Sequence, residues 1–380
     1  MKVVSLLPSA TELVCLVGGT DMLVGRSHEC DYPAAIKDRP ILTAAKNKFE
    51  SCQQMNDAVT ATLTTGDGLY YIFADVLKSL APDVIVTQSL CSVCSVDLRL
   101  VEQVVQEMQF SSSSSSSSNA TAAAAAPRII SLNPFNIEDV LQDALVVGEA
   151  LGLQAQAAAA VAALRGRVEA ALSFVARQPA VAAPVVAFLE WFEPLFPGGH
   201  WTPQLIHMAG GQHPLNPPRD GKGAGPSRPV WNDDLVALDP DWIIICPCGL
   251  DIEETVKELP PVTASGWWPQ LKAVQAGRVA LVDGNQMFNR PGPRLVDCLE
   301  FLVGLLHQQH HLIPSGFPWR FYKQGELAAA EEKWLQEHPG WKTRVQEGPP
   351  KTAAAAAAGG GCCVTGSCGA AAAPAGEVQQ

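Results

Sequence analysis

The chain has 380 residues, 47% of them hydrophobic and 17% charged, so it can bury a large core and has the length of about two domains with extensions. Its formal net charge of -12 at pH 7 provides no attraction for nucleic acid or for an anionic membrane surface, and neither is expected as a partner. No apolar run reaches the roughly 18 residues that a membrane span needs.

The N-terminus has a short apolar run and no small-residue cleavage site, so it does not have the features of a secretory signal. From this we expect an intracellular, cytoplasmic protein. The 11 cysteines are then expected to be reduced thiols or metal ligands and not a disulfide framework.

Strand and helix signals in the first third of the chain predict a wound, parallel sheet. Residues 3–6 are expected to form a strand, and Ser9-Ala-Thr-Glu12 has the spacing of a capping box that begins a helix. The same order returns at residues 128–139, where Asn136 is the expected helix cap. Repeated strand and helix units of this kind are typical of α/β lobes.

One sequence pattern occurs twice, at residues 77–88 and 235–246. In each copy a Leu-x-x-Leu helical turn ends at proline, and an apolar run typical of a strand buried on both faces follows. Each copy ends on paired cysteines: Cys91 and Cys94 after the first, Cys246 and Cys248 after the second. Because open α/β sheets bind ligands at the carboxyl ends of their strands, both pairs are expected at a functional edge.

Changes in composition and pattern divide the chain into five parts. The expected fold class is α/β, with two Rossmann-like lobes of mostly parallel sheets joined by a single long bridging helix. A Ser/Ala low-complexity insertion at residues 111–126 of the first lobe predicts a surface segment, and Gly152 is an expected break in the helical region. The parts are the N-terminal lobe (1–136), the bridging helix (137–178), the C-terminal lobe (179–312), a helical extension (313–346) and a disordered Ala/Gly-rich tail (347–380).

Five segments make the chain resemble a known family: residues 3–12, 25–33, 82–86, 209–211 and 289–294. In order and spacing they are similar to the vitamin B12 and iron-siderophore binding proteins with an Fe/B12 periplasmic-binding domain. The closest resemblance is to the cobalamin-binding branch of ABC-transporter substrate-binding proteins, and it extends over about residues 1–310.

The resemblance implies two α/β lobes joined by one rigid helix, with a ligand held in the cleft between them. It implies that the ligand is a cobalamin-like corrinoid or a chelated iron, bound without chemical turnover. Because no export signal precedes the first strand, the sequence argues against an ABC-transporter partner.

Three regions supply the candidate ligand contacts. The resemblance places such contacts in the loop after the second strand; in the alternative interpretation, Asp31 only caps a turn and His28 is solvated. The aromatic segment 190–201 suits a broad, partly apolar ligand, although half of its rings could be lobe core. The free N–H groups of the expected last helix favour an anionic group near Arg290, whereas Arg294 could pair with an acid. The candidates are His28, Glu29, Asp31, Tyr32, Gln88, Trp191, Glu193, Phe196, His200, Trp201, Asn289 and Arg290.

The cysteines support a second hypothesis, which is a metal site divided between the lobes. Cys91 and Cys94 have half of a zinc-type ligand set, and Cys246 and Cys248 could supply the other half. Zinc is the expected ion in that case. The alternatives are free thiols beside a bulkier ligand, or a thiol pair of low pKa that performs redox chemistry.

Three function classes follow from these features. The first is a binding protein for a metal-containing cofactor or chelate, and the second is a metal-ion binding or trafficking protein that uses the cysteines. The third is a thiol- or metal-dependent enzyme, for which the sequence offers no Ser-His-Asp order, no phosphate-binding Gly-x-x-x-x-Gly-Lys and no HExxH. We therefore expect no enzymatic activity and assign no catalytic residues.

Overall fold

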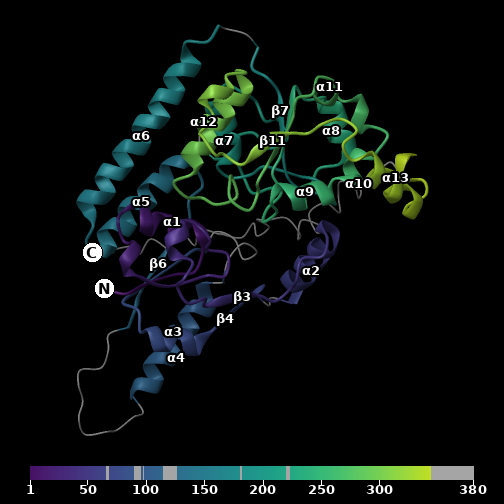
Figure 1. Cartoon of the computed structure of the whole chain (residues 1–380). Coiled ribbons are helices and arrows are strands. Elements are labelled where there is room, and N and C mark those ends of the chain that lie inside the picture. The colour runs from purple at the N-terminus through teal and green to yellow at the C-terminus, as the bar shows by residue number, and fades with distance from the viewer. Residues whose placement is uncertain are drawn as a thin grey trace, which may run out of the picture.

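The computed structural model describes residues 1–65, 68–89, 96, 98–113, 126–179, 182–219 and 223–343. They form two α/β lobes, with the N-terminal lobe in purple and blue in the lower half of Figure 1 and the C-terminal lobe in green above it. The predicted fold class is confirmed, because each lobe is built on a sheet with parallel strands and helices connect the two.

A four-stranded parallel sheet in the order β2-β1-β5-β6 forms the centre of the N-terminal lobe. The two central strands, β1 and β5, are buried along their whole length, as expected for parallel strands covered by helices. The strands are β1 (Val3–Ser5), β2 (Leu23–Arg26), β5 (Val84–Thr87) and β6 (Arg128–Ser131), and the helices are α1 (Pro8–Leu16), α3 (Ala74–Leu80) and α4 (Leu98–Ser113).

Helix α1 does not begin with the predicted capping box. Pro8 occupies its first turn, where the missing N–H costs no hydrogen bond, and Ser9 therefore lies inside the helix and does not cap it. Glu12 is buried, and its carboxylate pairs with Arg294 of the other lobe. The Ser-x-x-Glu spacing therefore does not mark a helix cap here, and Glu12 instead forms an ion pair between the lobes.

The sheet of the C-terminal lobe has five strands in the order β11-β10-β9-β7-β8. The three inner strands are parallel, and an antiparallel strand closes each edge. The strands are β7 (Val186–Trp191), β8 (Phe196–Pro197), β9 (Trp242–Ile245), β10 (Val279–Val282) and β11 (Trp319–Phe321). The helices are α7 (Thr202–Met208), α8 (Asn232–Leu238), α9 (Ile252–Glu258), α10 (Pro260–Thr263), α11 (Lys272–Gln275) and α12 (Leu295–Leu306).

The repeated sequence pattern is a repeated structural unit. Its copies form α3 with β5 in one lobe and α8 with β9 in the other. Both helices end on a residue in the left-handed region, Ala81 with a φ of 46° and Asp239 with a φ of 40°, and each is followed by proline. The two copies therefore deliver their strands to equivalent inner positions of the two sheets.

Two helices connect the lobes, where the sequence predicted a single bridging helix over residues 137–178 with a break at Gly152. Helix α5 (Ile137–Leu151) is capped by Asn136, whose side chain accepts a hydrogen bond from the N–H of Asp139 at 3.0 Å, as the sequence predicted. Gly152, with a φ of +71°, ends α5, and the long helix α6 (Gln154–Ala176) follows and runs along the edge of the molecule in Figure 1. Arg167 ties α6 to two carboxylates of α12, Asp297 and Glu300.

The lobes share one hydrophobic core. A single cluster of buried side chains continues from α1 and α5 of the N-terminal lobe into α6, α7 and α12. Representative members are Val14, Leu141, Leu205 and Leu302, all fully or almost fully buried. A continuous core of this kind resists large movements of one lobe against the other.

An excursion from the N-terminal lobe reaches across to the C-terminal lobe. We call residues 43–65 and 68–72 the strap; they contain β3 (Thr43–Ala45), α2 (Cys52–Thr65) and β4 (Tyr70–Ile72), and β3 pairs with β4. The N–H of Cys52 donates to Glu258 of α9 at 2.7 Å, and the Cys52 side chain joins the core of the C-terminal lobe. In Figure 1, α2 accordingly lies below α9 and α10.

The predicted helical extension contains a strand as well as a helix. Its first ordered element is β11, which pairs antiparallel with β10 and completes the sheet, and α13 (Ala328–Glu337) follows and packs against α10. The middle of the predicted low-complexity insertion, residues 114–125, and the predicted tail at 347–380 lie outside the described residues.

Candidate functional site

A cavity of about 400 Å³ lies between the two lobes. Its walls include residues at or shortly after the carboxyl end of a strand: Gln88 after β5, Trp191 at the end of β7, Cys248 after β9 and Asn285 after β10. This is the edge at which open parallel sheets place their ligand-binding side chains. The strap closes the remaining side with Asn47, Phe49, Met55, Asn56, Val59, Leu69 and Tyr70.

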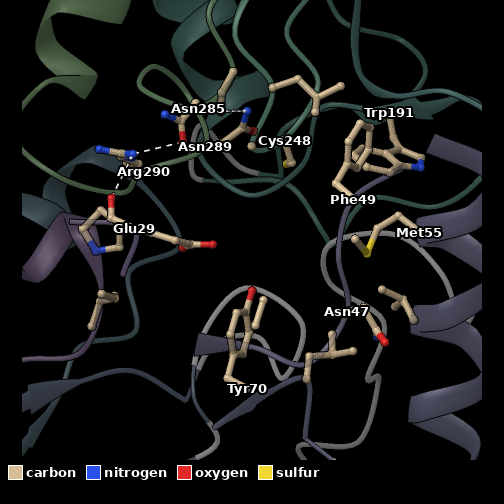
Figure 2. Close-up of a pocket in the computed structure, with 18 of the residues that line it drawn as sticks. Glu29, Asn47, Phe49, Met55, Tyr70, Trp191, Cys248, Asn285, Asn289 and Arg290 are labelled. Atoms are coloured by element: carbon tan, nitrogen blue, oxygen red, sulfur yellow. Dashed lines mark hydrogen bonds between the residues drawn. The ribbon is translucent and has the colours of Figure 1, made fainter. Parts of the chain in front are cut away.

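The cavity has a polar side and an apolar side. Figure 2 shows Arg290, Asn285 and Asn289 gathered at one side, and Trp191, Phe49 and Met55 at the other. A pocket that combines apolar surface with a few placed polar groups is typical of small-molecule binding sites.

Arg290 is the centre of the polar side, and its guanidinium is held by protein groups. Nη1 donates to Oδ1 of Asp31 at 2.5 Å, and Nη2 donates to the carbonyl oxygen of Glu29 and to Oδ1 of Asn285. The side chain is only 7% exposed. Asp31 and Glu29 come from the N-terminal lobe and Arg290 from the C-terminal lobe, so this network joins the lobes at the cavity.

A second ion pair lies behind the first. Arg294, at the N-cap of α12, makes two hydrogen bonds to the Glu12 carboxylate of α1, at 2.9 and 2.6 Å. Between the two arginines, Gly292 lies beside α1: a Cβ placed on it would be 3.4 Å from the Cα of Ser9, an ordinary contact distance.

The carboxyl groups of Asp31 and Glu29, at the polar side, have pKa values shifted in opposite directions. Burial alone would raise the pKa of Asp31, but the hydrogen bond and charge of Arg290 outweigh it and lower the pKa below its ordinary value. Desolvation raises the pKa of Glu29, and the more distant charge of Arg290 offsets only part of this rise. The Glu29 side chain is 42% exposed and lines the cavity.

The apolar side is built from aromatic and aliphatic side chains of both lobes. The rings of Trp191 and Phe49 meet edge to face, with 6.5 Å between their centroids. Met55, Val59 and Leu250 extend the same surface. The Trp191 and Phe49 contact also fixes the strap to the C-terminal lobe.

Residues 3–285 match the family model described as "Periplasmic binding protein". The chain belongs to this family. The match covers both sheets up to β10 and the strand ends that form the cavity. A search of curated protein sequences finds no match to the chain.

Solved periplasmic binding proteins share the fold of this family member. A periplasmic heme-binding protein from Pseudomonas aeruginosa superposes with a TM-score of 0.56 at 20% identity, over 85% of this chain and 95% of that one. The vitamin B12 binding protein BtuF of Vibrio cholerae gives 0.57 at 16% identity, over 81% and 97%. The heme-binding protein BhuT, solved with two hemes, gives 0.57 at 19% identity, over 81% and 98%.

The family assignment corrects the expected location. A cytoplasmic location is wrong, because the family that matches residues 3–285 and the solved proteins named above are periplasmic binding proteins. The N-terminal sequence, on which the expectation rested, does not decide the location, and the argument against an ABC-transporter partner fails with it. None of the described helices combines the length and apolarity needed to cross a membrane.

In this binding protein, part of the predicted loop after β2 turns away from the cavity. His28 is half-buried and its Nδ1 lies 2.7 Å from Oγ1 of Thr43, and desolvation lowers its pKa. Tyr32 is 47% exposed, and its ring lies 4.3 Å from the guanidinium carbon of Arg294. Of the four candidates in this loop, Glu29 lines the cavity and Asp31 reaches it through Arg290.

Most of the aromatic segment belongs to the lobe core. Trp201 is buried and donates its indole N–H to the carbonyl oxygen of Phe288 at 2.6 Å, and Phe196 is buried in β8. His200 is buried and stacks on Trp201, and desolvation lowers its pKa to about 4. Glu193 does not line the cavity. From this segment only Trp191 reaches the cavity, so the placement of Trp201 in the cleft is wrong.

The predicted metal site is only partly within the described residues. Cys91 and Cys94 lie outside them. Cys248 lines the cavity, whereas Cys246 is fully buried with its Sγ 3.8 Å from the carbonyl oxygen of Met287, and burial raises its thiol pKa. Within the part of the chain that the structure describes, no three His, Cys, Asp or Glu side chains are grouped to hold a metal ion.

Proposed function

We propose that this chain binds a metal-containing chelate, such as a haem, a corrinoid or an iron-siderophore complex, in the cavity between its lobes. It holds the ligand without chemical change and presents it to an ABC transporter. The proposal combines membership of the periplasmic binding protein family with a cavity made by both lobes. The related solved proteins bind heme or vitamin B12.

The cavity is the observation that carries the proposal. Its volume of about 400 Å³ falls within the range of small-molecule sites, and its lining offers a large ring surface opposite a polar edge. The chelates named above also have an apolar part and a polar part, with a flat or rounded apolar body and polar groups at the periphery. Trp191 and Phe49 are the side chains best placed to contact the body of such a ligand.

The lining gives no support to an enzymatic role. No histidine is among the described residues that line the cavity. Gln88 is buried and lines the cavity. A lining of this kind can bind a ligand and orient it.

Absorbance titration of the purified protein tests the proposal. Haem, cobalamin and a ferric hydroxamate are added separately, and we expect saturable binding of one of them at one site per chain, with a change in its visible spectrum. Native mass spectrometry of the protein from its own cells then gives the mass of the natural ligand. If no chelate binds and the protein instead carries stoichiometric zinc that is lost when Cys91 and Cys94 are replaced by serine, the metal-ion alternative replaces this proposal.

A further inference from the structure

We infer that the cavity selects neutral or cationic chelates with hydrogen-bond donors at their periphery, such as amides, and rejects chelates that carry carboxylates. The inference rests on the proposed function, because it concerns which ligand the same cavity accepts. It reverses the expectation from the sequence that the region around Arg290 suits an anionic group. Three features of the cavity lead to it.

The first feature is the balance of charge along the lining. Among the described lining residues the charged side chains are Glu29, Glu254 and Arg290. Arg290 already forms an ion pair with Asp31, and its Nη1 lies 3.9 Å from the Glu12 carboxylate. Since its charge is matched by protein groups, the two glutamates leave the lining acidic.

The second feature is that two neighbouring cations, Arg294 and Lys46, have partners of their own. Arg294 is bound to Glu12 through two hydrogen bonds, so the set of Glu12, Asp31, Arg290 and Arg294 holds two acids and two cations. On the strap, Lys46 lies over the ring of Tyr71, with its Nζ 5.4 Å from the ring centroid, and does not line the cavity. A ligand carboxylate therefore finds no unmatched cation among the described lining residues.

The third feature is an excess of acceptor oxygens. Asn289 uses its amide N–H groups on the carbonyl oxygens of Cys246 and Gly284, so these donors are not available to a ligand. The carboxylates of Glu29 and Glu254 add acceptors.

These acceptors need donors from the ligand. An amide N–H or a cationic group can donate to them, whereas a carboxylate offers only further acceptors. A carboxylate would also be placed close to Glu29, where the partly desolvated surroundings weaken screening by water. We expect about tenfold weaker binding for each ligand carboxylate that replaces an amide facing this side.

The test compares amide and carboxylate forms of the same chelate. Three cores are used: a corrin, as cobalamin and its derivative with peripheral amides hydrolysed to acids; an iron porphyrin, as the diamide of haem and haem itself; and a ferric trihydroxamate, as ferrioxamine B with its free ammonium group and its N-succinyl derivative. Absorbance or tryptophan-fluorescence titration of the full chain gives the dissociation constant of each form. For any core that binds, we expect the amide or ammonium form to bind at least tenfold more tightly.

Two substitutions connect that preference to the residues named. E29Q removes a charge from the lining, and D31N removes the acid that forms the ion pair with Arg290. Each should therefore reduce the ratio of the dissociation constants of the carboxylate and amide forms severalfold. E169Q, a charge-neutralising change on the exposed surface of α6, is the matched control and should leave the ratio unchanged.

The outcomes separate the inference from the proposed function. Equal or tighter binding of the carboxylate form overturns the inference and leaves the proposed function standing. A ratio that E29Q and D31N do not alter also overturns it, because the preference then arises elsewhere. Failure of all three cores in both forms overturns the proposed function itself.

Discussion

Glu12 of α1 and Arg294 of α12 form a two-hydrogen-bond ion pair that joins the lobes behind the cavity, with only 1% and 10% of their side chains exposed. The two residues are 282 positions apart in the chain. Together with the shared core and with Asp31 and Arg290, this pair fixes how the lobes face each other. The arrangement of the lobes around the cavity therefore depends in part on a buried ion pair that does not itself line the cavity.

The first prediction concerns that ion pair. R294M leaves the Glu12 carboxylate buried with only Arg290 nearby, and we expect the free energy of unfolding to fall by about 3 to 5 kcal/mol. Denaturant unfolding followed by tryptophan fluorescence measures the change. R165Q, which removes the exposed pair with Glu138, is the control and should cost less than about 1 kcal/mol.

A double variant distinguishes loss of the partner from loss of packing. E12L/R294M replaces both charges by apolar groups and should recover much of the stability that R294M loses, because no unpaired charge is then buried. If R294M unfolds at the same denaturant concentration as the unmodified protein, the pair does not hold the lobes together.

The second prediction concerns the apolar side of the cavity. W191A removes the ring that faces the ligand and contacts Phe49, and we expect chelate affinity to fall by between about tenfold and a hundredfold, which corresponds to the loss of one large buried side chain. Titration with the chelate that binds the unmodified protein measures it. W334A, on α13 and outside the cavity lining, should leave affinity unchanged. An unaltered affinity for W191A would place the ligand elsewhere.

The third prediction uses the cysteines as reporters of occupancy. Cys248 and Cys15 are both half-buried, but only Cys248 lines the cavity. A saturating chelate should slow alkylation of Cys248 by at least severalfold and leave that of Cys15 unchanged, as measured by mass spectrometry of the labelled peptides. The fully buried Cys246 and Cys298 should react only on unfolding, since burial raises the pKa of both thiols. Equal protection of Cys248 and Cys15 would indicate a general tightening of the fold and not a ligand in this cavity.

The fourth prediction concerns pH. Burial raises the pKa of Glu190 to about 7, and hydrogen bonds from Ser227 and Gly199 only partly oppose the rise. Oγ of Ser227 contacts both the Glu190 carboxyl and the carbonyl oxygen of Pro197, and one hydroxyl hydrogen cannot serve two acceptors. A protonated Glu190 resolves the conflict by donating to Ser227, which then donates to Pro197.

The sign of the effect follows from the raised pKa. The folded protein keeps a proton on Glu190 that the unfolded chain releases, so this contribution to stability is full below pH 4.5 and is lost as pH rises through about 7. E190Q should therefore reduce the change in the free energy of unfolding across this pH interval by up to about 3 kcal/mol, while E169Q should leave that change as it is. Denaturant unfolding at pH 5 and pH 8 makes the comparison, and parallel curves for E190Q and the unmodified protein would contradict it.

Local sequence signals predicted the strands and the positions that follow them. Gln88, Trp191 and Cys248 were predicted near the ligand because a buried strand is visible as an apolar run and the next residues lie at the carboxyl edge of the sheet, whereas Arg290 was chosen for its place before the last helix. The same reasoning cannot tell which way a side chain turns after the strand ends. Trp201 lies in a segment rich in aromatic residues, which suggested a place in the cleft. Helix α7 begins directly after it, however, and its ring packs in the core.

The strap is the part of the candidate site that sequence patterns did not predict. Strands β3 and β4 have three residues each, and α2 is rich in Gln and Thr, so neither periodicity nor hydrophobicity marks this region. Its place beside the cavity depends on Cys52 reaching Glu258, a contact across 206 residues of sequence. Glu12 was likewise read as half of a local capping box, because its partner lies in the other lobe.

The pairing of β11 with β10 has a consequence for the order in which the protein is made. Strand β10 would be an open edge until Trp319–Phe321 has been synthesised, and unpaired edges invite association between chains. The C-terminal lobe therefore cannot complete its sheet when the segment matched by the family, residues 3–285, leaves the ribosome. A chain shortened to that match would keep every strand-end residue of the cavity up to Asn285 and lose the strand that protects the lobe from aggregation.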